Sequence, residues 1–173
     1  GDAWIIAESG NSFCWSTHLL RFNEPGRYRV STGFGSMGHA TTGVVGAALA
    51  RRTKAVAMVG DGAMLMLNEV HTAVQHKVDA VWVVLNDACY QMCSQGMTAM
   101  GWTPFSCELP RVDFVGLARS LGADGVRVTR EEDLRDALLR AARAKGPFVV
   151  DVDIDGAEVP PSGRRNRSLM QQG

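Results

Sequence analysis

Short apolar runs alternate with more polar segments along most of this chain. The apolar runs are rich in β-branched residues and predict strands at residues 4–7, 28–30, 55–59, 80–85, 125–128 and 148–154. The segments between them predict helices at residues 11–21, 40–52, 64–78, 112–121 and 129–144. The runs at 55–59 and 80–85 are apolar throughout, as expected for strands buried on both faces of a parallel sheet. These elements predict an α/β fold, a doubly wound and mostly parallel sheet with helices on both faces.

Two stretches depart from this alternation. Residues 88–107 show no clear strand or long helix but are apolar for a loop, which favours a functional segment or one that a partner subunit covers. Residues 156–173 contain two consecutive prolines and three arginines and predict an extended or disordered tail. We therefore expect one domain over residues 1–155. The sequence Thr129-x-Glu131-Glu132 predicts a capped start for the last helix.

Polar residues follow directly after the two most apolar strands. The first is followed by Gly60-Asp61-Gly62-Ala63, and the second ends in Asn86-Asp87. Ligands of open α/β sheets collect outside the carboxyl ends of the strands, so we expect these residues to meet in space. Carboxylate and amide oxygens suit a hard cation such as Mg²⁺, which keeps phosphate oxygens in its coordination shell. The pattern predicts a magnesium and phosphate site at this edge.

This pattern resembles the cofactor motif of thiamine diphosphate enzymes. Three further stretches occur in the order that the family has: Glu8-Ser-Gly10-Asn11-Ser12, Gly33-x-Gly35-Ser36-Met37-Gly38, and the closing run from Gly146 to Asp151. The second is similar to the Gly-x-Gly-x-Met-Gly of acetolactate synthases. The resemblance covers about the first 155 residues.

The resemblance implies a role for each matching position. Asp61 and Asp87 would be side-chain ligands of Mg²⁺, and Cys89 would add its backbone carbonyl. Gly35 would face the aminopyrimidine ring of the cofactor, and Met37 would wedge beneath it, although Met37 could also be ordinary core. Asn11 and Ser12 could bind the terminal phosphate or merely cap a helix. The full set of cofactor-binding residues expected is Asn11, Ser12, Gly35, Ser36, Met37, Gly60, Asp61, Gly62, Ala63, Asp87, Cys89, Tyr90, Gln91 and Met92.

The same resemblance implies the chemistry. Thiamine diphosphate enzymes of this kind decarboxylate a 2-oxo acid such as pyruvate, and acetolactate synthases couple the product to an acyl acceptor. His39, just after Met37, is a possible substrate contact. The family also needs a glutamate from a separate pyrimidine-binding domain, for which 173 residues leave no room. Glu8, Glu24 and Glu69 belong to the diphosphate-binding half. We therefore expect a partner chain or domain and a hetero-oligomer such as a heterotetramer.

Two positions depart from the family pattern. Asp87 stands where the family has a second Asn but remains an oxygen ligand, so we expect cofactor binding to be kept. Gly96 stands where acetolactate synthases have a Trp, which leaves the reaction open: a glycine there would leave space for an acceptor larger than pyruvate or would only turn the loop. The alternatives are a simple decarboxylase of the phosphonopyruvate or sulfopyruvate type and a non-catalytic cofactor-binding module. A nicotinamide dehydrogenase would need G-x-G-x-x-G after the first strand, which this sequence lacks.

Composition narrows the remaining classes. The net charge of +0 and the hydrophobic content of 46% argue against a nucleic-acid-binding or disordered protein. No long apolar run or signal peptide is evident, so we expect a cytoplasmic protein that does not bind membranes. Cys14, Cys89, Cys93 and Cys107 lack the spacing of a zinc site and are expected to be reduced thiols.

Overall fold

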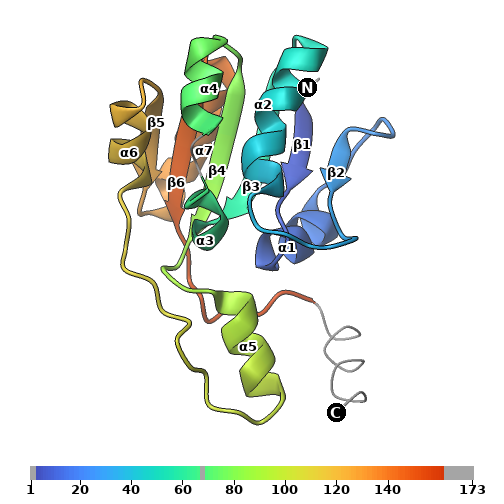
Figure 1. Cartoon of the computed structure of the whole chain (residues 1–173), viewed down its shortest axis with the longest axis vertical. Coiled ribbons are helices and arrows are strands. Elements are labelled where there is room, and N and C mark those ends of the chain that lie inside the picture. The colour runs from blue at the N-terminus through green and yellow to red at the C-terminus, as the bar shows by residue number, and fades with distance from the viewer. Residues whose placement is uncertain (1–2, 67–68, 162–173) are drawn as a thin grey trace.

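The computed structural model describes residues 3–66 and 69–161, in which strands and helices alternate (Figure 1). The six strands are β1 (Trp4–Ala7), β2 (Tyr28–Val30), β3 (Ala55–Gly60), β4 (Ala80–Asn86), β5 (Asp124–Val128) and β6 (Phe148–Asp153). The seven helices of the described residues are α1 (Asn11–Leu19), α2 (His39–Arg51), α3 (Asp61–Met64), α4 (Glu69–Gln75), α5 (Gln91–Ala99), α6 (Phe114–Ser120) and α7 (Glu131–Arg143). The predicted α/β fold is confirmed.

All six strands are parallel and lie in the order β2-β1-β3-β4-β6-β5. From β1 the chain crosses to β2 on one side and then returns to β3 on the other side. Right-handed crossovers in opposite directions place α1 and α2 on opposite faces of the sheet. The carboxyl ends of β1 and β3 therefore flank a switch point, where sheets of this kind open a crevice for ligands.

The sheet separates two apolar cores. On one face, α2, α3, α4 and α6 cover alternate residues of β3 and β4, and the fully buried Trp82 and Phe114 lie in this core. On the other face, α7 covers β4, β5 and β6 through Ala137 and Ala141. Because β4 contributes to both cores, nearly all of it is buried, as its continuous apolar sequence predicts.

The helices differ from the predicted ones in three places. The stretch from Gly60 to Ala63 is not a loop, since α3 begins at Asp61 directly after β3. The predicted helix over 64–78 is represented by α3 and the separate helix α4. The segment 88–107 contains the helix α5, which the sequence did not predict because none of its residues is buried and no apolar stripe marks it. The start of α7 also lacks the predicted cap: Arg130 is at the N-cap position, and the amides of the first turn donate to no capping side chain.

Beyond β6 the chain returns toward α5. The backbone oxygen of Gly156 accepts a hydrogen bond from the Gln91 side chain, and that of Glu158 accepts one from Gln95 at 3.3 Å. Residues 162–173, which include the three arginines of the expected tail, lie outside the described residues. The division at residue 155 stays a prediction.

Candidate functional site

A cavity of about 590 Å³ opens at the switch point, beyond the carboxyl ends of β1, β3 and β4. It is bounded by the first turn of α1, the loop after β2, the first turn of α3 and the start of α5. Thirteen of the fourteen expected cofactor-binding positions meet here. In full, the lining includes Asn11, Ser12, Gly35, Met37, Gly60, Asp61, Gly62, Ala63, Asp87, Cys89, Tyr90, Gln91 and Met92.

Two predicted residues lie outside this lining. Ser36 and His39 are both exposed on the outer side of the turn, where His39 is the first residue of α2. Gly96 is also absent from the lining: it lies on α5, and a Cβ added to it would meet no atom within 4 Å. The space expected around Gly96 is therefore open surface and not part of the cavity.

Asp61 and the turn after β4 are tied to each other. Asp61 Oδ1 accepts from the amide of Gly62 at 2.7 Å, and Oδ2 accepts from the amide of Cys89 at 3.1 Å. Asp87 lies on the same turn, and its Oδ2 is so close to Gly156 that a Cβ there would stand 2.8 Å away. The carboxyl ends of β3 and β4 thus bring two carboxylates to one wall of the cavity.

Burial and mutual repulsion shape the charge of this pair. Burial raises the pKa of Asp61, and backbone hydrogen bonds from Gly62 and Cys89 oppose that rise. Burial also raises the pKa of Asp87, and the neighbouring charge of Asp61 raises it further. The charge of Arg111 opposes the rise at both carboxylates without cancelling it, and a bound cation would oppose it further.

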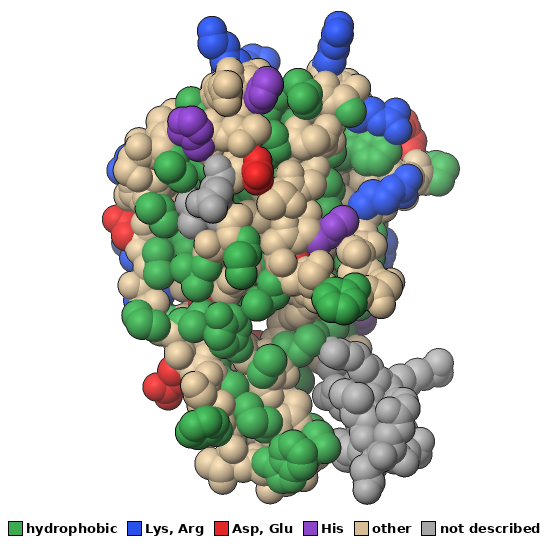
Figure 2. Space-filling model, in the orientation of Figure 1, with side chains coloured by type: hydrophobic (Ala, Val, Ile, Leu, Met, Phe, Trp, Pro, Cys, Tyr) green, Lys and Arg blue, Asp and Glu red, His purple; other side chains and the backbone are tan. Residues whose placement is uncertain are grey.

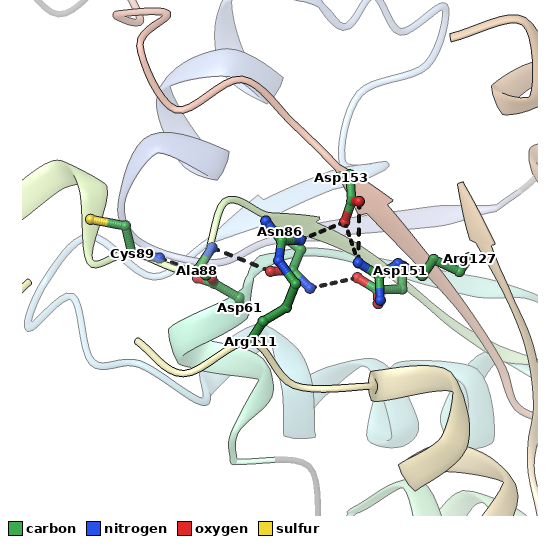
Figure 3. A network of polar contacts seen from close by, with 8 residues as sticks. All are labelled: Asp61, Asn86, Ala88, Cys89, Arg111, Arg127, Asp151 and Asp153. Carbon is green, nitrogen blue, oxygen red and sulfur yellow. Dashed lines mark hydrogen bonds and ion pairs between the residues drawn. The ribbon is translucent and has the colours of Figure 1, made fainter. Parts of the chain in front are cut away.

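The thiol of Cys89 takes no part in this arrangement. Burial, followed by the charge of Asp87, raises the pKa of Cys89 to about 11, so the thiol stays protonated at neutral pH. The side chain points away from Asp61, whereas the backbone amide faces it (Figure 3). Only the backbone of Cys89 is placed to serve the site. None of the four cysteines, all of which lie within the described residues, is in a disulfide, as predicted.

The first turn of α1 forms the opposite wall. Gly10, with φ of 96°, occupies the N-cap position, so no side chain caps this helix. Asn11 donates instead to Gln95 at 3.0 Å, and the Ser12 hydroxyl donates to the backbone oxygen of Glu8 at 3.2 Å. The expectation that Asn11 or Ser12 caps α1 is therefore wrong. Backbone of the first turn borders the cavity, as at a helix end that binds phosphate.

Glu8 fixes the loop that carries Gly35 and Met37. Its side chain is fully buried at the end of β1. Glu8 Oε2 accepts from the amides of Gly38 and Ala40 at 3.2 and 3.1 Å, and from the amide and hydroxyl of Thr41 at 3.4 and 3.3 Å. The Glu8 carboxylate therefore binds the amides at the N-terminus of α2 from the interior of the protein. The sequence analysis assigned Glu8 only to the diphosphate half and missed this role.

Tyr90 and Gln91 close the side of the cavity toward α5. The Tyr90 ring lies directly on Gly62, where any Cβ would overlap the ring. This close approach explains why the position after Asp61 needs a glycine. Gln91 binds the backbone of Gly156, which holds the segment after β6 against the same helix.

A second polar network lies behind the turn after β4 (Figure 3). The Asn86 amide donates to Asp151 Oδ1 at 2.9 Å, and Asn86 Oδ1 accepts from the amide of Ala88 at 3.3 Å. Beside it, Asp153 forms ion pairs with Arg111 at 2.7 Å and Arg127 at 3.0 Å. Burial raises the pKa of Asp151, and the hydrogen bond from Asn86 opposes the rise.

The donor set fits a hard divalent cation with phosphate ligands. Asp61 and Asp87 line the cavity, as do Asp155 and Glu158 of the segment after β6, and no group of three His, Cys, Asp or Glu side chains that could enclose a metal occurs within the described residues. Oxygen ligands and an incomplete protein shell are what Mg²⁺ uses when substrate phosphates supply the remaining positions. The glycines at 10, 35 and 60 leave the cavity side open, since an added Cβ would meet no atom closer than 4.0 Å.

Comparisons with known proteins show the family to which this chain is related. The sequence profile of the family described as "Thiamine pyrophosphate enzyme, C-terminal TPP binding domain" matches residues 8–152. A Mycobacterium tuberculosis protein named as a candidate acetolactate synthase large subunit, IlvB2, is 35% identical, with 89% of this chain and 28% of that protein covered. The acetolactate synthase of Bacillus subtilis is 31% identical, with 87% and 27% covered. The sulfoacetaldehyde acetyltransferase of Castellaniella defragrans is 31% identical, with 83% and 25% covered.

The chain thus spans little more than a quarter of the length of these relatives. Within the described residues, no helix is long and apolar enough to cross a membrane.

Proposed function

This chain belongs to the thiamine pyrophosphate enzymes and corresponds to their C-terminal TPP-binding domain. We propose that it holds the diphosphate and Mg²⁺ of thiamine diphosphate. We also propose that the enzyme of which it is part is a carboligase or decarboxylase acting on 2-oxo acids. The observation that supports the proposal most directly is the hydrogen bond between Asp61 and the turn after β4. The 3.1 Å hydrogen bond from Cys89 to Asp61 joins two strand ends at the sheet's switch point. Asp87 lies on the same turn and faces the same cavity.

Each wall of the cavity would hold one part of the cofactor. Asp61, Asp87 and the carbonyl of Cys89 would ligate Mg²⁺, and the first turn of α1 would donate to the terminal phosphate. Gly35 and Met37, on the loop anchored by Glu8, would support the rings of the cofactor. When bound, thiamine diphosphate supplies the carbanion chemistry that makes loss of carbon dioxide from a 2-oxo acid possible. The residues of this chain bind and orient it.

We propose that a pyrimidine-binding domain, on a partner chain or elsewhere in a longer protein, completes the site. The relatives are much longer than this chain, and the glutamates near the cavity are otherwise engaged or peripheral. Large apolar side chains are exposed: Phe34 (94%) lines the cavity, and Phe105 (83%) and Trp102 (59%) lie in the segment after α5. Apolar side chains also gather at the end of the molecule where α5 and its following segment lie (Figures 1 and 2). A partner domain that closes the cavity would bury this surface.

The reaction proposed is carboligation like that of acetolactate synthase, which follows the names of two relatives. Simple decarboxylation of a phosphonopyruvate or sulfopyruvate type is the alternative. Because Gly96 lies outside the cavity lining, it gives no support for a larger acceptor pocket within this chain. Met92 and Tyr90, which line the cavity, are the apolar side chains of this segment nearest to the cofactor space.

Calorimetric titration of the chain with thiamine diphosphate tests the cofactor assignment. Binding should require Mg²⁺, and Asp61→Ala should weaken it at least 100-fold because the cation loses a buried ligand. Asp136→Ala, an exposed position on α7, serves as the matched control and should leave binding unchanged. Equal binding by the unmodified chain and Asp61→Ala would contradict the site.

Carbon dioxide release from pyruvate tests the need for a partner. The purified chain should be inactive, and addition of the pyrimidine-binding partner should restore turnover. Turnover by the chain alone would overturn the two-domain proposal, while coupled products detected by mass spectrometry would separate carboligation from plain decarboxylation.

A further inference from the structure

Asp151 is a buried acid for which the proposed cofactor contacts provide no direct use. It lies on β6, is fully buried, and is flanked on its own strand by apolar residues. Its Oδ2 has no hydrogen-bond partner among the described residues. A buried carboxyl oxygen without a partner is costly, and its presence calls for a physical reason.

The reason lies in the contact that its other oxygen makes. In the register of β4 and β6, Asn86 stands opposite Asp153, so that Asp151 is the diagonal neighbour of Asn86 on the same face of the sheet. Asp151 Oδ1 accepts from Asn86 Nδ2 at 2.9 Å, and Asn86 is itself 1% exposed. An acceptor at this position forces the NH₂ group of Asn86 toward β6, which leaves Asn86 Oδ1 free to face the following turn.

Asn86 Oδ1 then holds a strained turn. It accepts from the amide of Ala88, whose φ of 55° lies in the left-handed region that non-glycine residues rarely adopt. That conformation directs the next amide, of Cys89, onto Asp61 Oδ2 at 3.1 Å. One continuous set of contacts therefore links Asp151, Asn86, Ala88, Cys89 and Asp61 (Figure 3).

We infer that Asp151 is a positioning residue for the cation site, which acts through Asn86 to hold the left-handed turn that joins the Asp87–Cys89 ligands to Asp61. The inference rests on the proposed function, because it assigns Asp151 a role toward the Mg²⁺ proposed there. Hydrogen-bond partners that stand behind metal ligands fix their orientation, and their loss commonly lowers metal affinity by about 10–100-fold.

Asp153 provides a matched control on the same strand. It lies two residues further along β6 and pairs with Arg111 and Arg127 instead of Asn86. Removing its charge breaks ion pairs of the same sheet edge without breaking the contacts from Asp151 to Asp61. The Asp153 variant therefore shows the effect of destabilising this edge of the sheet alone, without loss of the turn at Ala88.

Titration of the full chain with Mn²⁺ tests the inference. The concentration of free Mn²⁺ is measured by electron paramagnetic resonance, with and without thiamine diphosphate. Asp151→Val should weaken Mn²⁺ binding at least tenfold, whereas Asp151→Asn, which keeps an acceptor for Asn86, should stay within about threefold of the unmodified chain. Asp153→Asn should bind as the unmodified chain does. Asn86→Ala breaks the same contacts from the other side and should match Asp151→Val, so the test does not depend on one variant folding.

A rescue variant distinguishes positioning from simple destabilisation. Adding Ala88→Gly to Asp151→Val should recover part of the lost affinity, because glycine adopts the left-handed conformation without the help of Asn86. Thermal unfolding checks that each variant is folded. Unchanged Mn²⁺ affinity in folded Asp151→Val, or an equal loss in Asp153→Asn, would overturn the inference. If the unmodified chain binds Mn²⁺ neither alone nor with thiamine diphosphate, the proposed function itself fails.

Discussion

Glu8 and the pair Asp61 and Asp87 lie at the same edge of the sheet, yet their carboxylates are bonded in opposite ways. Glu8 Oε2 receives four hydrogen bonds from the first turn of α2 and from the turn that precedes it, all from groups within the protein. Asp61 receives bonds from two backbone amides, and burial raises the pKa values of both Asp61 and Asp87. A carboxylate whose bonding capacity is filled by backbone amides holds a loop in place. Carboxylates that repel each other at the wall of a cavity are suited to share a cation.

The N-termini of α1 and α2 differ in whether they are available to bind an anion. The N-terminus of α2 already holds an anion, the side chain of Glu8, and cannot take a phosphate as well. The N-terminus of α1 follows Gly10 and receives no side-chain cap. In the proposed site, a phosphate would therefore bind at α1, because one of the chain's own carboxylates already fills the corresponding position on α2.

Removing the Glu8 carboxylate should destabilise the fold, because this carboxylate holds the start of α2 in place. In Glu8→Ala, several amides at the start of α2 lose their acceptor inside the protein, which should lower the free energy of unfolding by about 3 kcal/mol. Urea denaturation measures the change. Glu24→Ala, whose partner Arg27 lies in an exposed ion pair, should cost less than about 1 kcal/mol. A loss below about 1 kcal/mol in Glu8→Ala would show that water replaces its contacts.

Changing Asp87 should alter the affinity for a divalent cation. Asp87→Asn keeps an oxygen ligand but removes one charge, so Mn²⁺ binding without thiamine diphosphate should weaken about tenfold, or about 1.4 kcal/mol. With thiamine diphosphate present the loss should be smaller, since Asp87 also repels the diphosphate. Titrations of Mn²⁺ under both conditions measure the difference. Equal losses under both conditions would mean that the charge of Asp87 does not reach the cofactor.

Asp151→Asn should give the smallest change, and the change should depend on pH. Burial raises the pKa of Asp151 above its ordinary value of 3.8, so the folded protein takes up this proton at a higher pH than the unfolded chain does. The ionised carboxylate therefore costs stability as the pH rises through the folded pKa, and no cost remains below the ordinary value. The amide should stabilise the fold by about 1 kcal/mol at pH 7, and this gain should vanish near pH 3.5. Unfolding temperatures across this pH range measure it, and a gain that persists at low pH would assign it to packing.

Sequence patterns predicted the parts of this molecule that depend on continuous burial. The strands β3 and β4 were predicted because both faces of each are covered, and the meeting of Asp61 with the Asp87 turn followed from the shared carboxyl edge. The helix α5 was not predicted, since a helix without buried residues has no apolar stripe. The role of Glu8 was hidden because its partners lie about thirty residues further along the chain. Asp151 did leave a signal, a carboxylate between two valines of an apolar strand, which the sequence analysis used only for the family resemblance.

The absence of buried residues in α5 has a consequence for motion. Local unfolding costs little where few apolar contacts are lost, and α5 is held mainly by the Tyr90 ring on Gly62 and by the side chains of Gln91 and Gln95. Amide hydrogens of α5 should therefore exchange with solvent long before those of the neighbouring strand β4, which lies in both cores. Because Tyr90, Gln91 and Met92 also line the cavity, each such opening would uncover the wall that carries Asp61 and Asp87 while the sheet stays folded. The rate at which a ligand enters or leaves the cavity would then depend on local unfolding of one short helix.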